Sequence, residues 1–207
     1  VANCGAAGST DMPDWDVSQV QSMEFLFQGM SSFNQDISRW NTSQVVSMKQ
    51  MFSEATLFHA DLSGWDISSV VDMTYMFRNT AAFNQDISEW NVGHVKIMDG
   101  MFKSSSFDRD ISAWDVRQVV SMDHMFRGNT HFDIDITGWN TGKLSSDMMF
   151  YGATAWLQKY YRNPTGTNGP PSAWNGIGAP PKPPSPKPPP PGEPSPPSPP
   201  PSIPPPP

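Results

Sequence analysis

The stretch that decides the fold is Ile37-Ser-Arg-Trp40-Asn-Thr-Ser-Gln-Val45-Val-Ser-Met48-Lys-Gln-Met51-Phe52, because close copies of it return along most of the chain. A fixed period of this length is typical of arrays in which each unit buries its apolar face against its neighbours. The sequence therefore predicts a solenoid. The copies are marked by tryptophans 25, 25, 25, 24 and 25 residues apart, at Trp15, Trp40, Trp65, Trp90, Trp114 and Trp139.

Each copy contains two apolar patterns. The tryptophan and the residue two positions after it are separated by one polar residue. This two-residue alternation suits a short strand with both side chains facing inward. The spacing then lengthens, and Val45, Met48, Phe52 and Ala55 stand at i, i+3, i+7 and i+10, which predicts a helix of about three turns. We therefore expect an α/β solenoid, a leucine-rich-repeat-type array of short parallel strands and short helices, followed by a polyproline II tail.

A phenylalanine follows each predicted helix, and an aspartate stands three residues after it. We expect the phenylalanines to stack as a buried spine, and we interpret the Met-Phe stripe as core rather than as a docking groove. The aspartates from Asp36 to Asp135 are expected to bond backbone amides in turns, an interpretation that we weigh above metal binding. The five phenylalanines are Phe33, Phe58, Phe83, Phe107 and Phe132.

Composition divides the chain into four parts. We predict an N-terminal lead-in at 1–14, a six-repeat solenoid with a C-terminal cap at 15–161, a linker at 162–179 and a Pro-rich tail at 180–207. In the cap, Leu157 is expected at the phenylalanine position. In the tail 19 of 28 residues are proline, so it adds no core and extends as polyproline II over roughly 85–90 Å, at about 3.1 Å per residue.

The charge and the cysteine content limit the classes of partner that the sequence predicts. The net charge is −7 and lysines and arginines occur singly along the sequence, so nucleic acid is not expected as a partner. There is no run of 18 apolar residues, so no membrane span is expected. The lone Cys4 is either an inert thiol or half of an intermolecular disulfide. A first residue of valine suits removal of a signal peptide.

Two resemblances follow from these motifs. The unit Trp-Asp-Ile-Ser-x-Val-x-x-Met-x-x-Met-Phe, seen from Trp65, resembles the BspA-like leucine-rich repeats of microbial surface proteins. This resemblance implies an extracellular array, implicated in adhesion, without catalytic residues. The Ser-Pro blocks of the tail look like those of plant and green-algal cell-wall glycoproteins, which implies hydroxylated prolines carrying O-linked sugars. The candidates are Pro186, Pro188, Pro189, Pro190, Pro191, Pro196, Pro197, Pro199, Pro200, Pro201, Pro204, Pro205, Pro206 and Pro207.

The residue after each tryptophan is alternately acid and amide. Such alternation relieves repulsion in a ladder of neighbouring strands, which are about 4.8 Å apart, and the ladder is interpreted first as structural and second as an inner-face strip that binds a glycan or calcium. Asn41-Thr-Ser is a sequon, so Asn41 is a candidate for N-glycosylation. The possible strip consists of Asp16, Asn41, Asp66, Asn91, Asp115 and Asn140.

No catalytic signature accompanies these motifs. The four histidines fall at different repeat positions, without a cysteine or carboxylate at a telling spacing, and we expect neither an enzyme nor a cofactor nor a metal site. The leading hypothesis is an extracellular structural glycoprotein of the cell surface or wall, whose copies join head to tail through the tail into a fibre. The alternative is a surface adhesin that binds a glycan or protein on the inner sheet, with the tail as a spacer.

Overall fold

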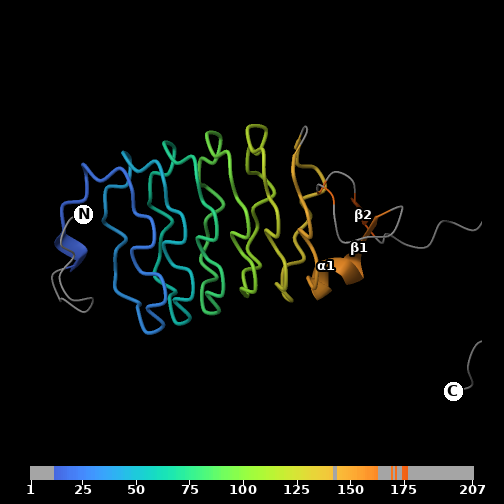
Figure 1. The fold of residues 1–207 in the computed structure, drawn as a ribbon, viewed down its shortest axis with the longest axis horizontal. Coiled ribbons are helices and arrows are strands. Elements are labelled where there is room, and N and C mark those ends of the chain that lie inside the picture. Colours follow the sequence, from blue (N-terminus) through green and yellow to red (C-terminus); the bar gives the residue numbers. More distant parts are fainter. Residues whose placement is uncertain (1–11, 142–143, 163–168, 170, 172–173, 177–207) are drawn as a thin grey trace, which may run out of the picture.

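The computed structural model describes residues 12–141, 144–162, 169, 171 and 174–176. The repeats form a stack of coils that lie side by side along one axis (Figure 1). The N-terminal repeat lies at one end of this stack, and the short C-terminal elements lie at the other. We number the coils 1 to 6, each starting at one of the tryptophans Trp15, Trp40, Trp65, Trp90, Trp114 and Trp139.

Regular secondary structure is confined to the two ends of the described chain. The 3-10 helix η1 (Met12–Asp14) precedes coil 1, and the helix α1 (Thr154–Lys159) and the strands β1 (Tyr160–Arg162) and β2 (Trp174–Gly176) come last. The two strands pair antiparallel. Between residues 15 and 141, all of which are described, there is neither helix nor strand. The prediction of an α/β solenoid with parallel strands and short helices is therefore wrong.

The hydrogen bonds explain why no helix forms along the Met-Phe stripe. In coil 2 every second amide donates to coil 3: the N–H groups of Met48, Gln50, Phe52 and Glu54 donate to carbonyl oxygens of the next coil at 2.8–3.0 Å. The amides between them close tight turns within the coil, as in Met51 N–H to the Met48 carbonyl at 3.1 Å. An α-helix needs each amide for its own i−4 carbonyl, so the stacking bonds and the helix exclude each other.

Backbone conformation excludes the helix as well. Gln50 and Glu54 have φ values of +55° and +67°, and their counterparts in the other coils are also positive. A residue in the left-handed region interrupts a right-handed helix. Two such residues in each coil turn the stripe into a series of bends.

Strand pairing is reduced to single contacts. Parallel bridges join one residue of each coil to the next, and each bridge is isolated rather than part of a strand. The expected inner sheet is thus replaced by a row of single-residue bridges. The row runs through Ser22, Ser47, Asp72, Ile97, Ser121 and Ser145.

The predicted phenylalanine spine and the buried Met-Phe stripe are confirmed. Phe52, Phe58 and Phe77 are fully buried, and their rings stack at centroid distances of 3.9 Å within a coil and 5.6 Å between coils. The tryptophans form a second stack, with the Trp40 and Trp65 centroids 6.4 Å apart. Each tryptophan from coil 2 onward also donates its indole N–H to the carbonyl oxygen of the residue three positions before the preceding tryptophan, at 3.0–3.3 Å. The aromatic columns therefore join neighbouring coils by both burial and hydrogen bonds.

The C-terminal end of the stack is closed by Trp156 of α1. This side chain is fully buried, and its ring lies 4.3 Å from Phe150 and 5.9 Å from Phe132. Trp156 therefore takes the position in the spine that the sequence assigned to Leu157. Tyr160 covers it from outside, with centroids 4.1 Å apart.

Candidate functional site

The predicted inner strip lies on exposed turns and not on a strand face. In five of its six residues the side-chain Oδ1 accepts a hydrogen bond from the backbone N–H two residues later, at 3.0–3.2 Å. These five are Asp16, Asn41, Asp66, Asn91 and Asp115. Asn140 is described, but residue 142, its counterpart donor, lies outside the described residues.

Local partners hold the strip carboxylates in their charged form. The Ser18 hydroxyl and then the Ser18 amide lower the pKa of Asp16, and Ser68 does the same for Asp66. The pKa of Asp115 falls to about 2, chiefly because the Arg117 side chain binds it in two places, at 2.8 and 2.6 Å. A ligand at this strip would compete with bonds that each turn already makes.

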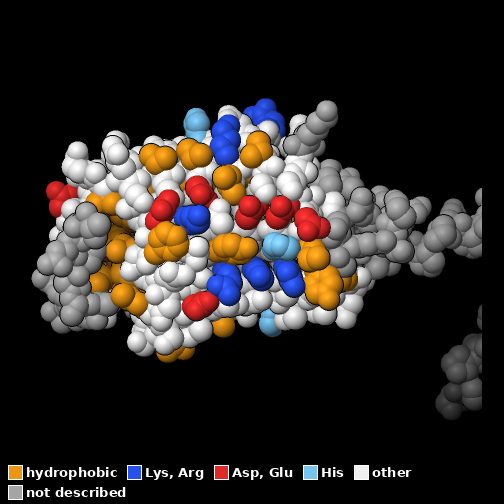
Figure 2. Space-filling model, in the orientation of Figure 1, with side chains coloured by type: hydrophobic (Ala, Val, Ile, Leu, Met, Phe, Trp, Pro, Cys, Tyr) orange, Lys and Arg blue, Asp and Glu red, His pale blue; other side chains and the backbone are white. Residues whose placement is uncertain are grey.

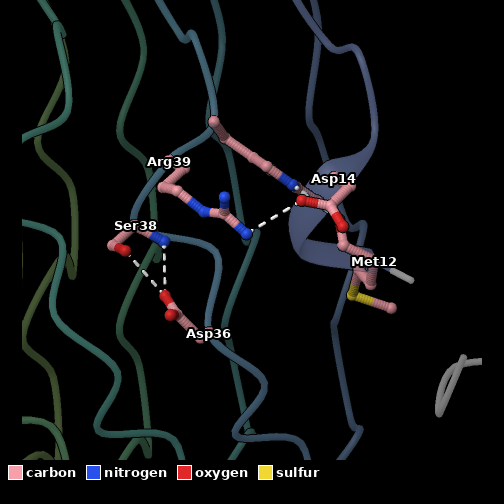
Figure 3. Close-up of polar contacts among 6 residues, drawn as sticks. Met12, Asp14, Asp36, Ser38 and Arg39 are labelled. Carbon is pink, nitrogen blue, oxygen red and sulfur yellow. Dashed lines mark hydrogen bonds and ion pairs between the residues drawn. The ribbon is translucent and has the colours of Figure 1, made fainter. Parts of the chain in front are cut away.

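The second acidic ladder also forms turns, as predicted. Figure 3 shows Asp36 accepting hydrogen bonds from the backbone N–H and the hydroxyl of Ser38, at 2.9 and 2.7 Å. Beside it, Arg39 forms an exposed ion pair with Asp14 at 2.8 Å. The same amide bond is made by Asp61, Asp86, Asp110 and Asp135.

Three predictions remain: the glycosylation site, the absence of a metal site, and the cysteine and tail residues. Asn41 is exposed, but the Ser43 hydroxyl of its sequon donates to the Asn41 Oδ1 at 2.8 Å. No group of three or more His, Cys, Asp or Glu side chains among the described residues could hold a metal ion. Cys4, all the tail prolines and most of the linker 162–179 lie outside the described residues.

A charged face that sequence reasoning missed runs along the outside of coils 3 to 6. Its basic row consists of Arg78, Lys103 and Arg127, one residue from each of three consecutive coils. Burial lowers the pKa of Lys103, and the charges of Arg127 and Arg78 lower it further. Among the described residues, Arg78 is paired with Glu54 at 2.8 Å, whereas Lys103 and Arg127 have no ion pair.

An acidic row lies on the same face (Figure 2). Asp99 Oδ1 accepts from the Ser121 hydroxyl and, at 2.9 Å, from the Asp123 amide of the next coil. Asp123 Oδ1 repeats this arrangement one coil further, with the Ser145 hydroxyl at 2.7 Å and the Asp147 amide at 2.6 Å. The carboxylates are therefore fixed at one oxygen by the neighbouring coil.

An aromatic side chain lies between the two rows. The Tyr75 ring covers Gly100 of the next coil so closely that a Cβ at Gly100 would overlap the ring. The Arg78 guanidinium and the Lys103 ammonium lie 5.9 and 5.8 Å from the Tyr75 ring centroid. Arg127 is similarly placed over Tyr151, at 5.3 Å. The basic side chains are thus held by rings, within cation–π range.

The sequence interpretation of the basic residues needs correction here. Lysines and arginines that occur singly along the sequence are brought into one row by the 25- and 24-residue period, because equal positions in successive coils stack. The signal was present at the thirteenth residue after the tryptophan, where Arg78, Lys103 and Arg127 all stand.

Comparison with known proteins identifies the family of the chain. Among the described residues no helix has the length and apolarity needed to cross a membrane. No curated protein and no solved structure matches the chain. A family model described as "Mycoplasma protein of unknown function, DUF285" matches residues 2–106 and 93–165, and this domain is found in BspA-like surface repeat proteins. Since these matches cover the repeats and well over half of the sequence, the chain belongs to the DUF285 family.

Proposed function

We propose that the protein is a BspA-like, non-enzymatic structural glycoprotein of the cell surface, wall or matrix. In this proposal the coils form a rigid head, and the Pro-rich tail at 180–207 joins one copy to the next in a fibre. Two features support it. The family domain is found in surface repeat proteins. In the described coils, most of the large aromatic side chains pack into one continuous core.

The difference between the two ends of the stack is the observation that carries the proposal. At the N-terminal end, the carbonyls of Ser22, Glu24, Leu26 and Gln28 accept no hydrogen bond from the described residues. At the other end, Trp156 and α1 close the aromatic core. We infer that copies do not continue one another coil on coil, and that a separate element connects them.

The tail has the properties of such an element. A polyproline II segment is stiff before it binds, so ordering it on a neighbour costs little conformational entropy. Contacts between unlike surfaces that do not close into a ring produce a filament. Hydroxylation and O-glycosylation of the tail prolines, from Pro186 to Pro207, would shield the segment and add to its stiffness. A glycan on Asn41 and an intermolecular disulfide at Cys4 belong to the same proposal.

Electron microscopy of the native protein, together with its intact mass, tests the proposal. We expect fibres, with a mass per subunit well above the 22.9 kDa of the chain. Deleting 180–207 should leave folded heads without fibres. A tail of equal length made of Gly and Ser, which keeps the number of residues but loses the polyproline geometry, should do the same. Fibres from either variant would contradict the role of the tail. Monomers of formula mass would favour the adhesin, and substituting Asp66 and Asp115 together would then test ligand binding.

A further inference from the structure

We propose that the charged face is a pairing surface for a second copy of the chain, related by a two-fold axis that runs parallel to the stack. This inference is independent of the tail-mediated assembly above, since it uses only described residues of the coils. It begins with the side-by-side arrangement of the two rows (Figure 2). The face is defined here by Asp99 and Asp123 in the acidic row, by Arg78, Lys103 and Arg127 in the basic row, and by Tyr75 between them.

Four of the five charged side chains on this face have no ion pair among the described residues, and the fifth, Arg78, is paired with Glu54. Lys103 and Arg127 have no ion pair with any described carboxylate. Asp99 and Asp123 use Oδ1 for their bonds to the next coil, and their second oxygen has no hydrogen bond to a described residue. Like charges stacked one coil apart repel each other. A partner that offers the opposite sign to both rows relieves both repulsions.

The charged side chains are also held in place before any partner arrives. The carboxylates are fixed by amides and hydroxyls of the next coil, and the cations by the rings of Tyr75 and Tyr151. Exposed ion pairs contribute only about 0.2–1 kcal/mol each, partly because flexible side chains lose entropy when they pair. Pre-ordered groups avoid much of that loss. The face is therefore better suited to pairing than its charge alone suggests.

Two parallel rows of opposite sign determine the symmetry of the pair. Rotation by half a turn about an axis along the stack exchanges the rows, so that each acidic row faces a basic row and both stacks point the same way. Rotation about an axis across the stack places acid against acid. The charges therefore select a parallel dimer with a self-complementary interface, the commonest symmetry of oligomers. A long polyanion is a poorer occupant, because the acidic row repels it.

Light scattering of the full chain at low and high salt is the first test. We expect a mass twice 22.9 kDa at about 0.01 M salt and a single subunit at about 1 M, where the Debye length falls from about 30 Å to about 3 Å. Lys103→Glu with Arg127→Glu should weaken the dimer by about tenfold or more. The matched control is Arg39→Glu with Arg109→Glu, which makes the same charge change at exposed positions away from this face.

A second pair of variants keeps the test independent of folding and fixes the orientation. Lys103→Gln with Arg127→Gln removes the charges without reversing them, and an unchanged melting temperature would show that the coils are intact. Gln50 lies in the same row as Tyr75, so Gln50→Cys in a Cys4→Ser background should form a disulfide with its own counterpart under a mild oxidant. Ser63→Cys, at an exposed turn, is the control.

Three results would overturn the inference. The first is a monomer at both salt concentrations up to about 1 mM. The second is a dimer that survives the reversal at Lys103 and Arg127, and the third is an intact dimer in which Gln50→Cys does not cross-link. Capture of a polyanion such as polygalacturonate by monomers would also assign the face to another partner. None of these outcomes affects fibres that depend on the tail, so the two proposals fail separately.

Discussion

Backbone strain is concentrated at two positions in each coil. Positive φ values recur at these positions and fall on Tyr75, Asn79 and Ser104 as well as on glycines. A left-handed conformation costs a residue with a side chain about 1–2 kcal/mol. The stacking bonds of the coils therefore hold several residues in a conformation that they would not adopt alone.

Replacing Ser104 by glycine tests this strain. Ser104 has a φ of +53° and is exposed, so Ser104→Gly should relieve the strain while adding freedom to the unfolded chain. At Ser106, where φ is not positive, the same change should only destabilise, by about 0.4–1 kcal/mol. We expect the free energies of unfolding in urea to differ by about 1–2 kcal/mol between the variants, in favour of Ser104→Gly. Equal effects at the two sites would contradict the strain.

The contact between Tyr75 and Gly100 predicts a strong coupling between these residues. Gly100→Ala places a methyl group on the Tyr75 ring at a φ of +56°, and should cost about 2–4 kcal/mol. In a Tyr75→Ala background only the backbone cost of about 1–2 kcal/mol should remain. A double-mutant cycle measured by urea unfolding gives the difference. Gly64→Ala, whose added methyl group meets nothing within 4 Å, is the control.

The coil as an element shows which part of a repeat can be predicted from its sequence. Burial was predicted correctly because apolar spacing reports which side chains face inward: Val45, Met48, Phe52 and Ala55 are all fully buried. The prediction of secondary structure was wrong because a run of tight turns can bury apolar residues at the same spacing as a helix does. A contrary signal was the glycine inside the stripe, at Gly100 in the first left-handed position of the coil and at Gly29, Gly128 and Gly152 in the second, all with positive φ.

The phenylalanine spine should dominate the stability of a coil. Phe77 is fully buried, and its ring stacks on those of Phe83, Phe52 and Phe102 at 3.9, 5.6 and 5.8 Å. We expect Phe77→Ala to lower the free energy of unfolding by about 3–5 kcal/mol. Phe25→Ala, at a ring that is 44% exposed, should change it by about 0.5 kcal/mol or less. Similar losses at both sites would show that the spine is not the core.

The turn aspartates predict a loss of stability in acid. The pKa values of Asp66, Asp86 and Asp115 lie below the ordinary 3.8, and that of Asp115 is about 2. A lowered pKa in the folded state adds stability above the unfolded pKa, and this stability is lost as pH falls through the folded value. The free energy of unfolding should therefore fall between about pH 4 and pH 2.

Asparagine provides the matched variant for this prediction. Asn41 and Asn91 already make the same turn bond as the aspartates, so changing Asp66, Asp86 and Asp115 to Asn should preserve the turns. Urea unfolding at several pH values should show a lower stability than the unchanged chain at pH 7 and a shallower decline in acid, so that the two converge at about pH 2. A decline as steep as in the unchanged chain would assign the acid sensitivity to other groups.

At the scale of the whole molecule, the surface was harder to predict than the interior. The turn aspartates were identified because each acts within its own coil. The charged face was not, because Asp99, Lys103 and Tyr75 meet only after coils of 25 and 24 residues come into register. An α/β interpretation would also have placed Asp99 and Lys103 at i and i+4 of one helix, where they would pair with each other instead of forming two rows. Outward positions become informative only once the stacking is known.

The direction of the hydrogen bonds between coils has a mechanical consequence. The N–H groups of Met73, Tyr75, Phe77 and Asn79 point along the stack to the next coil, so tension applied at the two ends pulls these bonds apart along their own length. The hydrogen bonds between one pair of coils then break before those of the next pair, so the coils separate by unzipping rather than by shear. Each released coil of 25 residues adds about 85 Å of chain, at about 3.4 Å per residue. Pulling by atomic force microscopy should therefore give a series of low, evenly spaced steps, and a single large rupture would contradict this. The head, rigid without load, would therefore lengthen coil by coil under tension and rewind when the tension ends.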